Sequence, residues 1–208
     1  MTHAHKTIGV LGGMGPEASA NLYSKIIKYS QHAYGAVQDS DYPPIILYSL
    51  PLEGFDETGI ADAMLVRRQL IAGVKRLESA GCDLIIIACN TVHVYYEEMQ
   101  SAVKIPIFNI VEETKKSVLT SGYKTVGLFA SESTSKLHLY EKSFDTANIT
   151  VITPNEKQQK ILNQVIEHVM GGNQKTEDII ALKEIAREYV RRGAEAIVMG
   201  CTEIPLAI

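Results

Sequence analysis

The chain of 208 residues has few cysteines and no excess of positive charge. Its three cysteines form neither a disulfide framework nor a Cys-x-x-Cys pair, so we expect free thiols and no bound metal. The formal net charge of −4 lacks the concentrated positive charge that a nucleic-acid surface needs. We therefore expect no nucleic-acid partner.

Long apolar runs and an N-terminal signal are also missing. No stretch approaches the roughly 20 apolar residues that cross a bilayer. Residues 1–6 lead directly into a predicted strand, without the apolar core of a signal peptide. These features predict a cytoplasmic protein with no membrane partner.

Two short apolar runs, at residues 80–91 and 192–203, repeat the same order of features. In each, a glycine precedes aliphatic residues typical of a buried parallel strand, and the strand ends in a cysteine followed by polar residues. The two halves also begin alike, with KTIGVLG at residues 6–12 and KTVGLFA at residues 124–130. A duplicated, strand-led unit is the simplest interpretation.

Strands and helices alternate along the chain, which predicts an α/β fold with parallel sheets flanked by helices. Strands are predicted at residues 8–11, 45–49, 105–110, 126–129 and 149–152 and in the runs before Cys89 and Cys201. Helices are predicted at residues 16–34, 62–80, 92–103, 111–120, 156–170 and 178–191 and within 131–144. We expect a first lobe at residues 1–112 that carries Cys89 and a similar second lobe at residues 113–208 that carries Cys201.

A pseudo-twofold axis between these lobes would bring the carboxyl ends of their strands to one site, where ligands of open α/β sheets bind. Cys89 would then lie opposite Cys201, and a thiol on each side of a substrate indicates proton transfer from both faces. Racemisation of an amino acid needs such a pair, because one group removes the α-proton and another returns a proton on the opposite face. Thiols suit this role because hydrogen-bond donors lower their pKa from about 8.5.

Polar residues directly after the two cysteines can orient the substrate. Asn90, Thr91 and Thr202 supply donors and acceptors for its ammonium and carboxylate groups. The alternative is that these residues only cap helices at ordinary strand-to-helix turns.

The first predicted strand leads into a glycine-rich loop, GGMGPE at residues 12–17. It matches neither G-x-G-x-x-G nor G-x-x-x-x-G-K-[ST], so a small carboxylate is a better ligand for the following helix start than a nucleotide. The second strand ends at Ser49 before a polar loop, and we expect this strand end to contact substrate as well.

In combination, these motifs resemble those of the cofactor-independent aspartate/glutamate racemases. The matching segments are GGMGPEA at residues 12–18, ACNT at residues 88–91 followed by His93, and GCTE at residues 200–203. The resemblance covers essentially the whole chain. It implies a homodimeric amino-acid racemase of two α/β lobes, in which Cys89 and Cys201 act as the two bases without pyridoxal phosphate or another cofactor.

The same resemblance implies further substrate contacts, at Met14, Gly15, Ser131, Thr134 and Lys160. The last of these would present a cation to a substrate carboxylate, and its alternative is an exposed helix lysine. His93 either orients Asn90 or has a structural role. Glu203 either tunes Cys201 or caps a helix.

Two departures from the family pattern leave other functions open. Many aspartate-specific members have an arginine in the loop after the second strand, and residues 49–56 contain none. Members also usually continue beyond the second cysteine motif with a further strand and helix, whereas this chain ends at Ile208. The main hypothesis is an aspartate or glutamate racemase. The alternatives are an isomerase like maleate isomerase, a decarboxylase of small dicarboxylic acids that uses one thiol, or a non-catalytic amino-acid binding protein.

Overall fold

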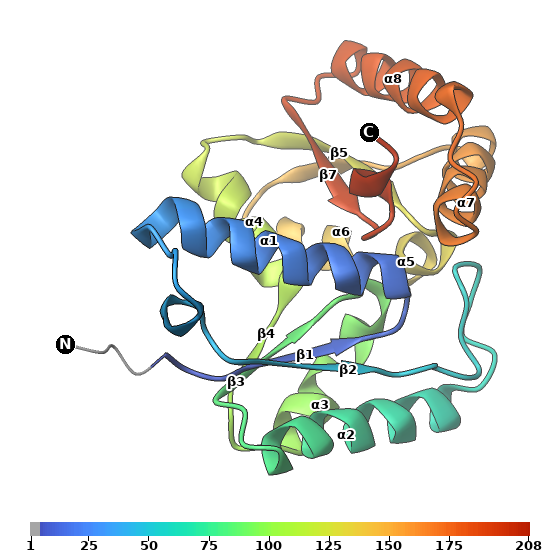
Figure 1. The fold of residues 1–208 in the computed structure, drawn as a ribbon. Helices are drawn as coiled ribbons and strands as arrows, with labels where there is room; N and C mark the ends of the chain where they lie inside the picture. Colours follow the sequence, from blue (N-terminus) through green and yellow to red (C-terminus); the bar gives the residue numbers. More distant parts are fainter. Residues whose placement is uncertain (1–4) are drawn as a thin grey trace. The chain divides into compact units, whose positions relative to one another are not determined.

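The computed structural model describes residues 5–208, which the pattern of internal contacts divides into two units. Unit 1 comprises the residues up to Gly54 together with Asp62–Ala88 and Tyr95–Phe108. Unit 2 comprises Phe55–Ala61, Cys89–Val94 and Asn109–Ile208. Each unit contains one parallel sheet with flanking helices (Figure 1), so the predicted α/β class is confirmed. The predicted lobe boundary after residue 112, the pseudo-twofold axis and a site between lobes stay predictions.

The sheet of unit 1 has the strand order β2-β1-β3-β4. Its strands are β1 (Ile8–Gly12), β2 (Ile45–Ser49), β3 (Leu84–Ile87) and β4 (Ile107–Phe108). Helix α1 (Pro16–Tyr34) covers one face, and α2 (Ala63–Ser79) and α3 (Tyr96–Ser101) lie on the other (Figure 1). A short 3₁₀ helix, Asp39–Asp41, precedes β2. Strand β1 is covered on both faces of the sheet. Its successive residues Val10 and Leu11 point to opposite faces, and both are completely buried.

The sheet of unit 2 has the strand order β6-β5-β7. Its strands are β5 (Thr125–Ala130), β6 (Thr150–Ile152) and β7 (Ala196–Gly200). Helix α4 (Ile110–Thr120) precedes β5. Helices α5 (Glu132–Leu137) and α6 (Leu139–Asp145) lie between β5 and β6 in the chain, and α7 (Glu156–Met170) and α8 (Thr176–Arg191) lie between β6 and β7. A last 3₁₀ helix, Ile204–Leu206, follows β7.

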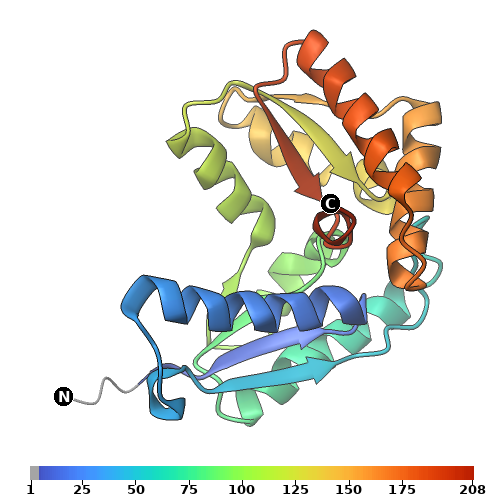
Figure 2. The same cartoon turned by 45° about the horizontal axis from the view of Figure 1, so that its top comes forward.

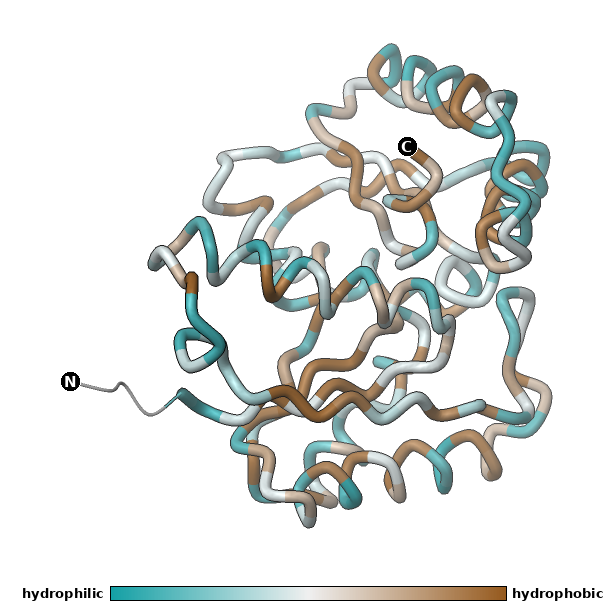
Figure 3. Tube along the Cα trace, in the orientation of Figure 1, coloured by the Kyte–Doolittle hydropathy of each residue, from teal (hydrophilic) through white to brown (hydrophobic). Residues whose placement is uncertain are grey.

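Alternate residues of β5 enter different clusters of apolar side chains. Val126 and Leu128 pack with residues of α4 and α6, whereas Phe129 packs with residues of α7 and α8. Because successive side chains of a strand point to opposite faces, helices cover both faces of this sheet (Figure 2). Along α7 and α8, apolar and polar residues alternate, as expected of helices that bury one side (Figure 3).

The two sheets repeat one arrangement. In each, the first strand of its half is central, and it pairs on one side with the strand that precedes a cysteine motif. Cys89 follows β3 by two residues, and Cys201 directly follows β7. This agrees with a duplicated strand-led unit.

The main differences from the predicted elements lie in two helices. The predicted helix at 92–103 consists of a 3₁₀ segment, Thr91–Tyr95, followed by α3. The helix predicted within 131–144 is divided into α5 and α6 at His138, whose φ of 51° lies in the left-handed region and cannot continue an α-helix.

The glycine-rich loop after β1 is fixed by close packing within unit 1. Ser19 of α1 accepts a hydrogen bond from Gly13 N at 2.9 Å and donates one to Gly15 O at 3.0 Å. A Cβ at Gly12 would overlap Ser19 Oγ. Gly13 has a φ of +93°, and a Cβ there would overlap the backbone of Leu50. Two of the glycines are therefore required by conformation and by space.

Replacing Gly13 by alanine tests this packing. We expect Gly13→Ala to lower the free energy of unfolding by on the order of 3 kcal/mol, because strain and overlap with backbone add. The matched control is Gly35→Ala, where φ is +71° but no atom lies within 4 Å of the added Cβ. There we expect a loss of about 1 kcal/mol from strain alone. Equal losses in urea unfolding would contradict the packing argument.

Candidate active site

Cys89 lies in the turn between β3 and the 3₁₀ segment, and its contacts assign it to unit 2. Its side chain is almost completely buried. Burial raises the pKa of the Cys89 thiol to about 12, while hydrogen bonds from the backbone N–H groups of Val92 and Thr91 act in the opposite direction. The turn therefore already provides donors that would stabilise a thiolate.

His93 holds this turn in place. Ile110 N donates a hydrogen bond to His93 Nε2 at 3.3 Å, so Nε2 is the acceptor nitrogen of the ring. The other nitrogen, Nδ1, then carries the hydrogen and donates it to Cys89 O at 2.8 Å. These bonds join the cysteine turn to the start of α4 and favour the structural role for His93.

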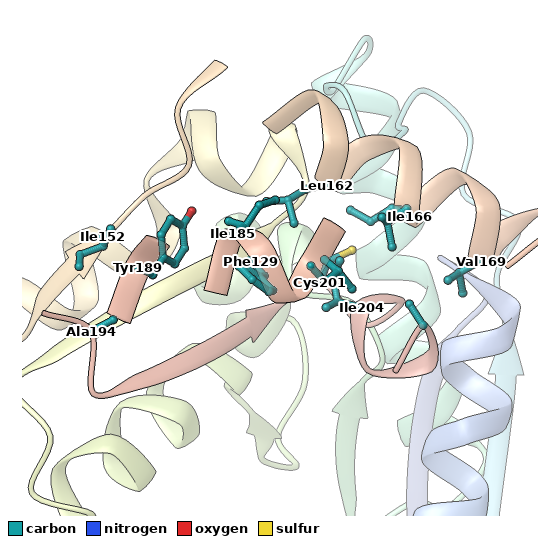
Figure 4. Close-up of a cluster of buried hydrophobic side chains, with 13 residues drawn as sticks. Phe129, Ile152, Leu162, Ile166, Val169, Ile185, Tyr189, Ala194, Cys201 and Ile204 are labelled. Carbon is teal, nitrogen blue, oxygen red and sulfur yellow. The ribbon is translucent and has the colours of Figure 1, made fainter. Parts of the chain in front are cut away.

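Cys201 follows β7 and lies in the apolar cluster of α7, α8 and the last 3₁₀ helix. Figure 4 shows it with Leu162, Ile166 and Ile204. Its thiol donates a hydrogen bond to Glu203 Oε2 at 3.1 Å, and Thr202 Oγ1 donates to the same oxygen at 2.9 Å. Burial and the neighbouring Glu203 carboxylate raise the pKa of the Cys201 thiol well above its usual value.

The two thiols interact electrostatically. A negative charge at Cys89 contributes to raising the pKa of Cys201, and the Glu203 carboxylate raises the pKa of both. Two thiolates and a carboxylate in one buried group would repel one another strongly. The arrangement therefore favours no more than one thiolate at a time.

Three buried hydroxyl groups form a hydrogen-bonded cluster next to the cysteine turn. Thr91 Oγ1 lies 2.7 Å from Thr134 Oγ1 and 3.4 Å from Ser131 Oγ. Ser131 also caps α5, because its Oγ accepts a hydrogen bond from Thr134 N at 3.3 Å. The fold thus brings Thr91 of the first cysteine motif to the loop after β5.

The start of α5 is held from two directions. Asn163 of α7 accepts a hydrogen bond from Glu132 N at 3.2 Å and donates one to the Glu132 carboxylate at 2.9 Å. Ser133 N donates to Glu57 O at 3.0 Å, and Ser133 Oγ donates to Asp56 O at 3.1 Å. These polar groups fix the loop that carries the hydroxyl cluster.

Asn90, directly after Cys89, is 3% exposed and accepts a hydrogen bond at Oδ1 from the Tyr140 hydroxyl at 2.5 Å. Tyr140 lies in α6 and is itself completely buried. Sequence reasoning missed this tyrosine, because a tyrosine on the apolar side of a helix indicates no more than a core position.

The remaining predicted site residues have different surroundings. Thr202 is half-buried beside Cys201. Lys160 is exposed on α7, in a groove of about 600 Å³ that Glu132, Ser135 and Gln159 also line. Met14 and Gly15 are buried in the loop after β1, and Ser49 is the exposed last residue of β2. These three belong to unit 1.

The model of the Asp/Glu/hydantoin racemase family matches residues 11–208. The chain belongs to this racemase family. The broad specificity amino-acid racemase RacX of Bacillus subtilis is 36% identical over 197 residues, which are 95% of this chain and 85% of that protein.

Solved structures of racemase relatives have a similar fold. An aspartate racemase homologue from Pyrococcus horikoshii is 33% identical with a TM-score of 0.77, over 98% of this chain and 88% of that chain. The aspartate racemase of Picrophilus torridus is 28% identical with a TM-score of 0.76, over 98% and 84% of the two chains.

Membership of the racemase family confirms the resemblance predicted from the motifs and the predicted enzyme class, an isomerase that racemises amino acids. In residues 5–208, no helix has the length and apolar character that crossing a membrane requires. The roles of individual site residues, the homodimer and the cytoplasmic location stay predictions.

Replacing Glu203 tests its effect on the thiols. Because the carboxylate charge raises the pKa of Cys201 and Cys89, the neutral variant Glu203→Gln should lower both, so that thiolate forms at lower pH. We expect the Cys201 transition to move to lower pH, measured by the ultraviolet absorbance of the thiolate during a pH titration.

Two further variants make this titration specific. Adding Cys201→Ser to Glu203→Gln should remove the shifted absorbance transition, which would assign that transition to Cys201. Glu184→Gln, at an exposed position of α8, is the matched control and should leave the titration unchanged. A transition at the same pH in Glu203→Gln and in the unmodified protein would contradict the proposed electrostatic effect.

Proposed function

We propose that this racemase interconverts the L and D forms of aspartate or glutamate, without a cofactor, by proton transfer at Cys89 and Cys201. The observation that carries the proposal is the matching placement of two buried thiols, each of which follows a strand that pairs with the central strand of its sheet. Two groups of the same type suit a reaction that runs in both directions with exchanged roles.

In the proposed reaction, one sulfur starts as a thiolate and the other as a thiol. The thiolate takes the α-proton and becomes a thiol, and the electron pair of the broken C–H bond remains on the substrate as a carbanion. The other thiol then donates its proton to the opposite face of that carbon and becomes a thiolate. No proton is gained or lost overall, and the enzyme is left ready for the reverse direction.

Burial holds the pKa of both thiols high, so the starting thiolate requires a positive charge nearby. A substrate ammonium group next to a thiol would lower its pKa, because an opposite charge favours the charged form. The N–H groups of Thr91 and Val92 would add to this effect at Cys89. Binding of the amino acid would thus generate the base.

The polar groups around the thiols would hold the substrate. We assign Asn90, Thr91, Ser131, Thr134 and Thr202 to contacts with its ammonium and carboxylate groups. The hydroxyl cluster supports this, since hydroxyl groups both donate and accept. Met14, Gly15, Ser49 and Lys160 are proposed as further contacts on the basis of the family resemblance.

The nature of the substrate side chain is proposed from the similar proteins. Two similar structures are described as those of an aspartate racemase and an aspartate racemase homologue, which favours an acidic side chain. RacX is named as an enzyme of broad specificity. RacX and the Picrophilus torridus protein are named as racemases, which favours racemisation over the isomerase, decarboxylase and binding alternatives.

The two-thiol mechanism predicts the effect of single cysteine replacements. Cys89→Ser and Cys201→Ser should each lower the rate of racemisation by about a hundredfold or more, because a hydroxyl is a much weaker acid than a thiol. The measurement is the loss of circular dichroism with time for L- and D-aspartate and L- and D-glutamate, because one remaining thiol could still exchange the α-hydrogen of one enantiomer without inverting it.

Cys82→Ser is the matched control for these variants. Cys82 is a buried free thiol in unit 1, next to Gly9. The control should retain activity. Unchanged racemisation in either of the other two variants would overturn the mechanism.

A panel of amino acids tests substrate preference. We expect loss of circular dichroism with time for L- and D-aspartate or L- and D-glutamate, and slower loss for amino acids with neutral or basic side chains. Equal rates across the panel would contradict the proposed preference for acidic amino acids and would show broad specificity. No change with any amino acid, together with no incorporation of solvent deuterium at the α-carbon, would overturn the proposed activity.

A further inference from the structure

Only one end of the Asn90 amide has a hydrogen-bond partner among the residues that the structure describes. Its Oδ1 accepts the hydrogen bond from Tyr140. Its Nδ2 is enclosed by the protein, and among the residues that the structure describes it has no hydrogen-bond partner. A buried amide nitrogen without an acceptor is unfavourable, and proteins rarely retain one without a reason.

The hydrogen bond with Tyr140 shows which end of the Asn90 amide lacks a partner. In the structure the Tyr140 hydroxyl donates to Oδ1 of Asn90, so the amide oxygen faces the tyrosine. The two N–H donors of Nδ2 therefore remain for another acceptor.

The ring of Tyr140 is fixed by packing from two sides. It lies edge to face on Phe144, with ring centroids 5.6 Å apart and an interplanar angle of 83°. A Cβ on Gly200 would approach Tyr140 Cε2 to 3.0 Å, so the missing side chain leaves room for the ring. Gly200 precedes Cys201, whereas Asn90 follows Cys89. Tyr140 thus contacts the immediate neighbours of both thiols.

We propose that Tyr140 is a positioning residue, which holds Asn90 so that its Nδ2 group donates to the carboxylate of the bound amino acid. The inference rests on the proposed function, because that function supplies the carboxylate. A carboxylate suits the site, since it is an acceptor only and can take both N–H donors. The tyrosine itself acts through the asparagine and takes no part in proton transfer.

The test removes the hydroxyl and keeps the ring. In Tyr140→Phe the packing on Phe144 and Gly200 remains, but the amide of Asn90 loses its fixed partner. We expect the affinity for the amino acid to fall about tenfold, seen as a higher KM with a smaller change in kcat. The amino acid is the best substrate of the panel described above, or L-aspartate and L-glutamate if none turns over.

A matched control separates this effect from loss of a buried hydroxyl in general. Tyr189 is also completely buried, also lies over a strand glycine, Gly127, and donates its hydroxyl to Leu128 O at 3.3 Å. Tyr189→Phe should therefore leave KM and amino-acid affinity unchanged. An equal loss of affinity in both variants would show that the effect is structural, and would overturn the inference.

A double variant tests whether Tyr140 acts through Asn90. Asn90→Ala should weaken binding by itself, and adding Tyr140→Phe to it should have no further effect. If Tyr140→Phe weakens binding by the same factor in the unmodified protein and in Asn90→Ala, Tyr140 does not act through Asn90 and the inference is wrong.

A spectroscopic measurement makes the result independent of turnover. In protein labelled with ¹⁵N asparagine, the side-chain amide signal that is lost in Asn90→Ala identifies Asn90. This signal should shift when amino acid is added to the unmodified protein, and should already be displaced in Tyr140→Phe. No shift on addition of amino acid would overturn the inference even if racemisation is observed. A clear shift without α-deuterium incorporation would overturn the proposed racemase activity and keep the inference.

Discussion

Burial of Cys89 and Cys201 governs the protonation of both thiols. It is the largest influence on each pKa and favours the neutral form. Any thiolate must therefore be stabilised by fixed donors or by a bound cation, because a buried charge loses most of its hydration. The N–H groups at the start of the 3₁₀ segment provide such donors at Cys89, and the carboxylate of Glu203 opposes them.

A second constraint comes from parallel strands. Such a sheet places the carboxyl ends of all its strands at one edge, and polar residues after the strands gather there. In unit 2 this edge carries the hydroxyls of Ser131 and Thr134 after β5, and Cys201 after β7. The short segment Cys89–Val94 joins the same group of contacts. Thr91, Ser131 and Thr134, from distant parts of the chain, thereby form one hydrogen-bonded cluster.

Much of the fold was predictable from local pattern. The strands at residues 8–11, 45–49 and 126–129 match β1, β2 and β5 within one residue, because they are short apolar runs bounded by turn residues. The break at His138 was not predicted, because histidine also occurs within helices, although it is enriched in left-handed backbone among residues other than glycine. Lys160 is exposed on α7, which agrees with both of its alternatives, a cation for a substrate carboxylate and an exposed helix lysine.

The sequence by itself determined the two cysteine motifs, their repetition and the family to which the chain belongs, because these depend on the order of residues alone. Only the tertiary structure decided which side chains approach those cysteines. Tyr140 reaches Asn90 across fifty positions of sequence, and Thr134 reaches Thr91 across forty-three. Such contacts depend on how sheets and helices pack, and packing is a property of the whole unit that no local pattern records.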